Sequence, residues 1–315
     1  MNTRRIQLIA GSTYTVSLPK DWISKNKLKS KDEVSVSQMG DGNLLISPKT
    51  IKDRNLKEIS LNLSEYAQNI DQVLFETYYL GFETIHLTSN TPLSKEVRAK
   101  VRKVLTRMVG TEISYEDSKK ITITVLLDKS KVDLIQILYR IFLLIESSIT
   151  NLVEGLDINE IKINENEIDR LYHLNTKIIS LSLTNSEVLS SSKIRNVSLI
   201  PSYFLISKKL ENMGDAINHM AKYIVKSKYK LDKKEVLGFF QEELSRSIKY
   251  ILKGPHEMFV RSNQDEFLKN KEVISKTKDK IVESYFLEML RYLEDVQIEI
   301  VNISFFNKLY SHKEH

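Results

Sequence analysis

The sequence predicts a multidomain α+β protein in three parts, and three observations lead to this fold class. Residues 1–49 contain short runs of alternating hydrophobicity, typical of strands, around one predicted helix. Residues 50–128 alternate between predicted strands and helices, which indicates a small α/β middle domain. Residues 129–315 contain few glycines and prolines, and their apolar residues repeat at helical spacing, which predicts an all-α body.

The head, residues 1–49, is predicted to contain two strands, one helix and one hairpin. The strands cover 4–9 and 13–18 around a Gly11-Ser12 turn, the helix covers 20–28, and the hairpin turns at Asp41-Gly42. Pro19 suits the first turn of the helix, where its missing N–H costs nothing, and Trp22, Ile23 and Leu28 are placed for burial. Because fifty such residues bury too little apolar surface, we expect a second copy to complete the core.

The positive charge of the chain is concentrated in its first 31 residues. This segment has one acidic residue, Asp21, and seven basic ones: Arg4, Arg5, Lys20, Lys25, Lys27, Lys29 and Lys31. The rest of the chain has 40 basic and 40 acidic residues, so the net charge of +6 comes from the head alone. A local basic patch on a neutral body is typical of a segment that binds a polyanion, and the alternative is a solvated helix face.

The order of motifs in the head resembles that of the SpoVT/AbrB-type DNA-binding domain. A strand is followed by Ser17-Leu18-Pro19-Lys20, a helix with Trp22, the run Lys31-Asp32-Glu33-Val34 and a hairpin. The resemblance implies a homodimer in which swapped hairpins from two chains form one β-barrel. It also implies DNA as a partner, contacted by Arg4, Arg5, Lys20, Lys25 and Lys27. Some members of that family are antitoxins that bind a toxin, so DNA binding is implied by the family and not by the residues alone.

The middle segment, residues 50–128, is predicted to be a βαβαβ domain that links the head to the body. The predicted strands are 57–63, 83–89, 111–117 and 119–127, and the predicted helices are 64–81 and 94–110. Its glycines are single and stand where helices end, so there is no glycine-rich phosphate loop. His86 lies in a strand among apolar residues and is expected to be packed rather than to bind a ligand.

The body is predicted to be two tandem three-helix bundles, at about 129–228 and 229–315. Helices are expected at 133–156, 164–183 and 197–229, with a later helix that repeats the third one. The third helix has apolar residues spaced alternately by four and three: Leu199, Tyr203, Ile206, Leu210, Met213, Ile217, Met220 and Ile224. The later helix repeats this at Phe286, Met289, Leu293, Val296, Ile300 and Ile303. The offset of eighty residues indicates an internal repeat with left-handed bundle seams.

Two pairs of carboxylates in the first bundle are candidate ligands for a metal ion. Glu211 and Asp215 stand one helical turn apart, with Asn218 on the same stripe, and Glu165 and Asp169 repeat the spacing on the preceding helix. Like charges at this spacing repel unless a cation lies between them. That cation is either a metal such as Mg, Ca, Mn or iron, or a neighbouring Arg or Lys. A solvated acidic stripe is the remaining alternative.

The helical body resembles PhoU, a family of phosphate-signalling helical bundles. Residues 210–224, LENMGDAINHMAKYI, are similar to its E-R-I-G-D-x-A-x-N-I-A signature, and 166–174, NEIDRLYHL, to its paired helix. The resemblance implies metal binding through two E/D-x-x-x-D motifs. Glu211 and Asp215 match the first motif, but the second has Arg291 in place of its first carboxylate, before Asp295. We therefore expect one divalent or iron ion per chain. The whole layout resembles archaeal PhoU-type regulators.

Composition and these resemblances lead to one predicted function and one alternative. The chain has no cysteine and no run of eighteen apolar residues, which excludes thiolate chemistry and predicts a cytoplasmic protein without membrane insertion. No enzyme is expected, because the six histidines are scattered without a base–nucleophile arrangement. The prediction is a DNA-binding transcriptional regulator of phosphate uptake and homeostasis. The alternative is an adaptor that regulates a phosphate transporter, binds transport or signalling proteins, and uses its head only to dimerise.

Overall fold

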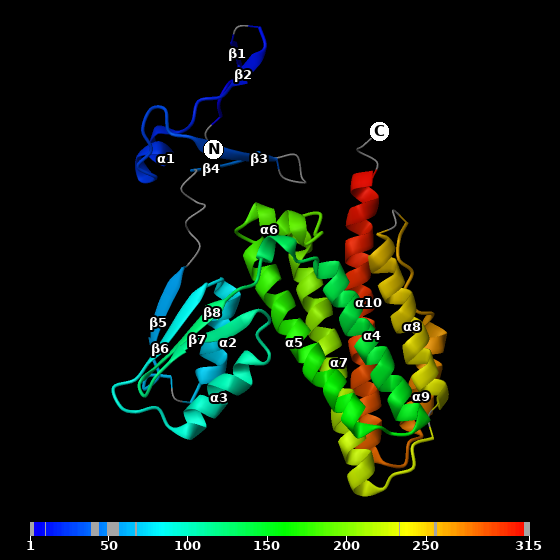
Figure 1. Ribbon diagram of the computed structural model, residues 1–315. Coiled ribbons are helices and arrows are strands. Elements are labelled where there is room, and N and C mark those ends of the chain that lie inside the picture. The colour runs from blue at the N-terminus through cyan, green and yellow to red at the C-terminus, as the bar shows by residue number, and fades with distance from the viewer. Residues whose placement is uncertain are drawn as a thin grey trace. The chain divides into compact units, whose positions relative to one another are not determined.

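The fold is known from a computed structural model that describes residues 3–9, 11–38, 44–48, 57–66, 68–232, 234–254 and 257–311. The chain divides into two compact units, Met1–Asn55 and Leu56–His315 (Figure 1). The first unit contains short strands and one helix, and the second contains an α/β layer followed by long helices. This composition confirms the predicted α+β multidomain fold class.

The first unit consists of two antiparallel strand pairs and a short helix. Strand β1 (Gln7–Ile9) pairs with β2 (Thr13–Thr15), and β3 (Val34–Gln38) pairs with β4 (Leu44–Pro48). Helix α1 (Lys20–Lys25) lies between them in the chain. The predicted strand 13–18 is therefore too long, because its partner strand ends opposite Thr15. The predicted Asp41-Gly42 turn lies outside the described residues.

The described part of this unit has little core of its own. Leu8 and Tyr14 stand opposite each other in the β1–β2 pair, yet 54% and 74% of their surfaces are exposed. Val36, Leu44 and Leu45 of the other pair are also exposed. Trp22, Ile23 and Leu28, which were expected to be buried, are only half-buried. One copy of this unit thus leaves most of its apolar side chains in water, which is unfavourable.

The second unit begins with a two-layer α/β region. Its elements are β5 (Glu58–Asn62), α2 (Ile70–Leu80), β6 (Thr84–Thr88), α3 (Lys95–Leu105), β7 (Thr111–Glu116) and β8 (Lys120–Val125). The sheet order is β5-β6-β8-β7, with β5 and β6 parallel and the other neighbours antiparallel. The elements follow the predicted βαβαβ order with the predicted additional strand, and the sheet is mixed because β8 lies between β6 and β7.

One face of this sheet is apolar and packs on α2 and α3. Ile85, Leu87, Ile121 and Ile123 form a core with helix residues such as Tyr78. The other face is polar, and there His86 Nδ1 lies 3.1 Å from the Thr122 hydroxyl, as expected for a packed histidine.

Both helices of the α/β region are shorter than the sequence pattern predicts. Helix α2 begins at Ile70 instead of residue 64, because Asn62 Oδ1 accepts hydrogen bonds from the N–H and hydroxyl of Ser64 and holds a turn after β5. Its end at Gly81 is as predicted, and Gly81 has the left-handed φ of +90° that favours glycine. Helix α3 ends at Leu105, before Gly110.

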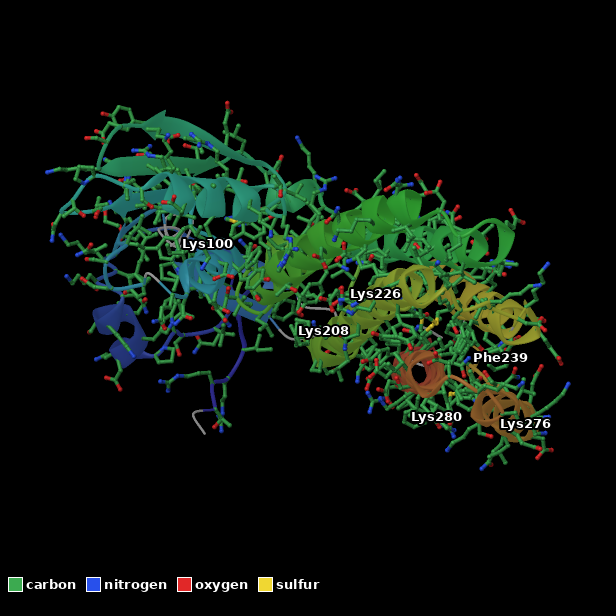
Figure 2. All side chains as sticks on the ribbon, turned by 90° about the horizontal axis from the view of Figure 1, so that it is seen from below. Lys100, Lys208, Lys226, Phe239, Lys276 and Lys280 are labelled. Carbon is green, nitrogen blue, oxygen red and sulfur yellow. The ribbon has the colours of Figure 1, made fainter. Side chains whose placement is uncertain are left out.

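The rest of the unit is a bundle of long helices. These are α4 (Leu134–Glu154), α5 (Ile158–Ser182), α6 (Ser186–Ser191), α7 (Ile200–Ser227), α8 (Lys234–Lys253), α9 (Gln264–Ser275) and α10 (Lys280–Ser311), and their side chains are drawn in Figure 2. Helix α5 begins six residues before the predicted start, since Asp157 Oδ1 accepts from the N–H groups of Asn159 and Glu160.

The two predicted apolar seams form the centre of the bundle. The seven seam residues on α7, Leu199 in the turn just before it and all six on α10 are buried, and the two helices pack along each other. Helix α4 is long and apolar enough to cross a membrane by length and composition alone. More than half of its apolar window is buried in the fold, where α4 packs on α5, α7 and α8.

Candidate metal centre and basic head

The five basic residues that were predicted to contact DNA are all exposed. Arg4 and Arg5 precede β1, Lys20 and Lys25 are the first and last residues of α1, and Lys27 follows that helix. Lys27 has a left-handed φ of 56°, which directs the chain away from the end of the helix. Long exposed cations in this arrangement are available to phosphate groups.

Three of the four predicted metal ligands come together between α5 and α7. One oxygen from each of Glu165, Asp169 and Asp215 lies within 4.8 Å of the others. Glu165 and Asp169 are buried, and Asp215 is half-buried. Glu211 precedes Asp215 by one turn and lies outside this group of three. The four residues are called the acidic cluster below, and its three converging oxygens are suited to a hard cation.

Three members of the acidic cluster already have a basic partner. Lys208 Nζ lies 2.6 Å from Glu211 Oε2, Lys162 forms an ion pair with Glu165, and Arg107 Nη2 lies 3.1 Å from Asp169 Oδ2 (Lys208 is labelled in Figure 2). Arg107 belongs to the α/β region, so this contact joins two parts of the unit. Asp215 has no basic side chain within 4 Å in the described part of the chain. The predicted alternative of a neighbouring Arg or Lys thus holds for three carboxylates.

Three members of the acidic cluster, Asp169, Glu211 and Asp215, have raised pKa values. Burial raises the pKa of Asp169 to about 6 despite the opposing effect of Arg107, and the neighbouring carboxylates add to the rise. Burial also raises the pKa values of Glu211 and Asp215, with a contribution from Glu165. An added cation would favour the charged carboxylates and lower these pKa values. The residues present therefore fit a metal ion.

Asn218 provides a second observation beside the acidic cluster. It follows Asp215 by three residues on α7, its side chain is 1% exposed, and both of its polar atoms lack a hydrogen-bond partner in the described structure. A buried amide without a partner calls for an explanation, and a bound water or ion is one of them. An amide oxygen is also a normal ligand for a hard cation.

The α/β region packs on α5 just beyond the acidic cluster. His173, four residues after Asp169, stacks on Phe75 of α2 with 3.7 Å between ring centroids, and its Nδ1 contacts the Tyr79 hydroxyl. Burial, together with Arg107 and Lys208, lowers the pKa of His173 to about 3, so its ring is neutral near pH 7. No pattern in the sequence indicates this role, because the partners of His173 are about a hundred residues away.

Lys177 extends the same contact by one more helical turn. Its Nζ donates a 2.7 Å hydrogen bond to the Tyr78 carbonyl and lies 4.1 Å from the centre of the Tyr78 ring. The side chain is 2% exposed, and burial lowers its pKa to about 7. At Gly81, a Cβ atom would lie 2.7 Å from Leu181 Cδ2, so α2 approaches α5 closely. One face of α5 therefore carries Glu165 and Asp169 of the acidic cluster and also the contact with the α/β region.

The predicted second repeat, helices α8 to α10, has a different arrangement at the place that the eighty-residue offset makes equivalent. Asp295 Oδ2 lies 2.7 Å from Lys209 Nζ of α7, and Arg291 lies near the ring of Tyr292. Among the described residues, the first bundle contains the one group of three carboxylates close enough to share an ion.

Two protein-family models match the chain. Residues 7–53 match the model described as antidote-toxin recognition MazE, bacterial antitoxin, and residues 135–224 match the PhoU domain. The second match runs from α4 to α7 and includes the whole acidic cluster. Comparisons with curated proteins and with solved structures give no significant match. The chain thus combines a MazE/AbrB-like N-terminal segment with a PhoU domain, which is the architecture that the sequence predicts.

Proposed function

We propose that this protein is a homodimeric cytoplasmic DNA-binding regulator of phosphate uptake and cellular phosphate homeostasis, and that it catalyses no reaction. The observation that carries the proposal is the presence in one chain of a basic MazE/AbrB-like head and a PhoU domain. The PhoU domain supports a role in phosphate homeostasis. The positive charge on the head supports an interaction with DNA through phosphate groups.

The exposed apolar residues of the head support dimerisation. Leu8, Tyr14, Val36 and Leu44 lie on strands that each pair along one edge in the described part of the head, and a second chain would remove them from water. A dimer also presents two copies of the basic segment, which doubles the number of phosphate groups that it can bind. Affinity for DNA rises steeply with that number.

The acidic cluster supports one divalent or iron ion per chain. Glu165, Asp169 and Asp215 would hold it, with Glu211 kept nearby by Lys208. A bound cation would supply the positive charge that the cluster lacks and stabilise the packing of α5 on α7. Arg107 fixes the α/β region to Asp169, so the charge state of the cluster bears on how firmly that region is held.

Binding of the full-length protein to promoter DNA of phosphate-transport genes tests the proposal. Replacing Arg4, Arg5 and Lys20 by Ala should weaken binding and reduce the slope of log K against log salt by about 1 for each phosphate that is no longer neutralised. The matched control replaces Lys222, Lys226 and Lys249, which are exposed on α7 and α8, and should leave the slope unchanged. Equal weakening in both variants would show that only net charge matters, and no DNA binding by the wild type would refute the proposal.

A second candidate function is an adaptor that acts on a phosphate transporter and uses the head only to dimerise. The antitoxin description of the head match favours it, because antitoxins bind proteins as well as DNA. On this alternative the triple variant of the head would retain its phosphate-dependent effect on transport in cells. The regulator proposal expects that effect to disappear together with promoter binding.

A further inference from the structure

The second bundle contains a pocket of about 570 Å³, lined by α9, α10 and the segment just before α9. This volume lies within the range of natural small-molecule sites. The pocket is separate from the acidic cluster, since all its lining residues lie in the part of the chain from Arg261 to Gln297. By the eighty-residue offset, Arg291 stands where the first bundle has Glu211, and Arg291 lines this pocket.

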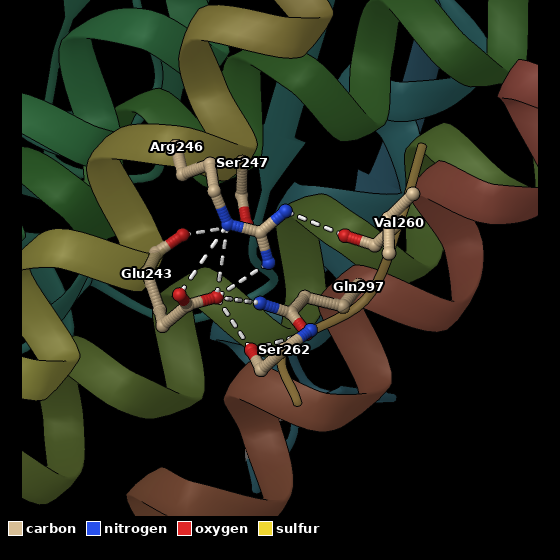
Figure 3. Close-up of polar contacts among 6 residues, drawn as sticks. All are labelled: Glu243, Arg246, Ser247, Val260, Ser262 and Gln297. Carbon is tan, nitrogen blue, oxygen red and sulfur yellow. Dashed lines mark hydrogen bonds and ion pairs between the residues drawn. The ribbon is translucent and has the colours of Figure 1, made fainter. Parts of the chain in front are cut away.

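Two lining residues of the pocket, Ser262 and Gln297, belong to a hydrogen-bonded cluster with Glu243 and Arg246, which lie behind the lining (Figure 3). Glu243 Oε2 accepts from Arg246 Nη2 at 2.6 Å, from Gln297 Nε2 at 2.7 Å and from the Ser262 hydroxyl. Gln297 Oε1 in turn accepts the Ser262 N–H at 3.0 Å. The cluster therefore holds the Ser262 and Gln297 side of the pocket in place.

This cluster also fixes the segment between α8 and α9. Arg246 donates to the Val260 carbonyl (Figure 3). Its guanidinium lies 4.7 Å from the centre of the Phe259 ring. Burial raises the pKa of Glu243, but the hydrogen bonds from Arg246, Ser262 and Gln297 outweigh it and keep the pKa below its usual value. The carboxylate is therefore charged and fully engaged, and the pocket wall is preformed before any ligand binds.

Three basic residues line the pocket without a carboxylate partner. Arg261, Lys271 and Arg291 have no Asp or Glu oxygen within 4 Å among the residues that the structure describes. Guanidinium groups bind phosphate and carboxylate oxygens with paired hydrogen bonds, which an ammonium cannot do in the same geometry. Two acidic residues, Glu288 and Glu294, also line the pocket and can accept hydrogen bonds from ligand hydroxyl groups.

The remaining wall is apolar. Phe267 and Leu268 from α9 line the pocket together with Leu287 and Leu290 from α10. Leu268 is 55% exposed, although a leucine in a finished core would be covered. An aromatic and three leucine side chains in this setting are suited to a flat apolar ring.

We propose that the pocket binds a nucleotide, that is, an organic phosphate with hydroxyl groups and a flat ring. The phosphate binds to Arg261 and Arg291, the hydroxyl groups to Glu288 and Glu294, and the ring to the wall of Phe267 and Leu268. Each of the three parts of a nucleotide thus has a matching part of the pocket. Glu211 in the first repeat lies beside a site suited to a cation. Arg291 stands at the equivalent position in the second repeat, and its positive charge suits an anion.

The test is calorimetric titration of the full-length protein with a panel of nucleoside mono- and diphosphates, with adenosine and inorganic phosphate as separate probes. At least one nucleotide should bind ten times more tightly than either adenosine or inorganic phosphate. Arg261→Ala and Arg291→Ala should each weaken that nucleotide at least tenfold, since each removes a charged hydrogen-bond donor. Lys276→Ala is the control, because Lys276 pairs with Glu272 at the end of α9, outside the pocket, and it should bind within twofold of the wild type.

Leu268→Glu tests the apolar wall by a different route. Leu268 is exposed, so the variant should fold with an unchanged circular dichroism spectrum, but its carboxylate should repel the nucleotide and remove binding. The proposal is overturned if no nucleotide binds more tightly than inorganic phosphate, or if adenosine binds as well as its phosphates. It is also overturned if the arginine variants bind like the wild type. None of these outcomes depends on whether the head binds DNA.

Discussion

Arg107 of the α/β region and Asp169 of α5 form an ion pair, with 3.1 Å between Nη2 and Oδ2. Asp169 is also one of the three carboxylates whose oxygens converge in the acidic cluster. The same carboxylate can therefore serve either as an anchor for the α/β region or as a ligand for a cation. This shared use makes Arg107 one residue through which the middle region and the PhoU domain can affect each other.

Replacing Arg107 by Ala should increase the affinity of the acidic cluster for Mn²⁺. The guanidinium competes with a cation for Asp169, and its removal leaves a buried carboxylate without a partner. We expect a gain in affinity of about tenfold by calorimetry, in line with one charged hydrogen bond. Arg102→Ala is the matched control, because Arg102 pairs with Glu116 inside the α/β region. Unchanged or weaker Mn²⁺ binding in Arg107→Ala would contradict the idea of competition.

The second prediction concerns Asp215 and Glu211 of the acidic cluster, of which only Asp215 belongs to the group of three converging oxygens. Asp215→Ala should remove the stoichiometric metal and the stabilisation that added Mn²⁺ gives the wild type, which is about 2.7 kcal/mol at a hundredfold excess over Kd. Glu211→Gln should retain metal with a smaller decrease in affinity, because Glu211 is held by Lys208 and lies outside the three-oxygen group. Elemental analysis and thermal melts measure both. Metal kept in Asp215→Ala would place the site elsewhere.

Much of the bundle could be predicted from sequence, because its seams depend on a local repeat. Every seam residue predicted on the third helix of the body is buried, since the spacing of four and three fixes one face of a helix whatever packs on it. Element ends were less predictable. The start of α2 depends on the Asn62 side chain, and the start of α5 depends on Asp157, which are single hydrogen-bonding choices that hydrophobic spacing does not record.

Contacts between distant segments could not be predicted. Arg107 and Asp169 are in different parts of the chain, and no motif connects them. The same holds for Glu243, Ser262 and Gln297, whose hydrogen bonds join α8, a loop and α10. Each is an ordinary polar residue in the sequence and acquires its role only when the helices pack. Only the spacing of the carboxylates on α5 and α7 and the family resemblance pointed to the first bundle as a site.

The exposed apolar residues on the strands of the head lead to a prediction about dimerisation. Leu8→Lys with Tyr14→Lys should convert a dimer of the full chain to a monomer, because the pair faces each other across β1 and β2 and is exposed in one chain. Burying two such side chains contributes on the order of 3–6 kcal/mol, enough to decide a micromolar equilibrium. Light scattering measures the mass. The control Leu126→Lys, also at an exposed leucine but in the second unit, should remain dimeric. A monomeric wild type would disprove head-mediated assembly.

The buried Lys177 side chain leads to a prediction of how the stability of the folded protein depends on pH between 7 and 10. Its pKa is about 7 in the folded protein, because burial disfavours the ammonium, whereas it is about 10.4 in an unfolded chain. Folding therefore favours the neutral amine. The resulting contribution to stability is present above pH 10.4 and is lost as the pH falls through 7, so the stability of the wild type should rise between pH 7 and pH 10.

Lys177→Met keeps the aliphatic volume and removes the titrating group, and the Tyr78 carbonyl still accepts from the Gly81 N–H at 3.2 Å. The variant should therefore be more stable than the wild type at pH 7, by on the order of 1–3 kcal/mol, and show a flatter profile to pH 10. Lys226→Met, at an exposed lysine of α7, should follow the wild-type profile in urea unfolding. A difference between Lys177→Met and wild type that stays constant from pH 7 to pH 10 would mean that Lys177 contributes through packing and not through its charge.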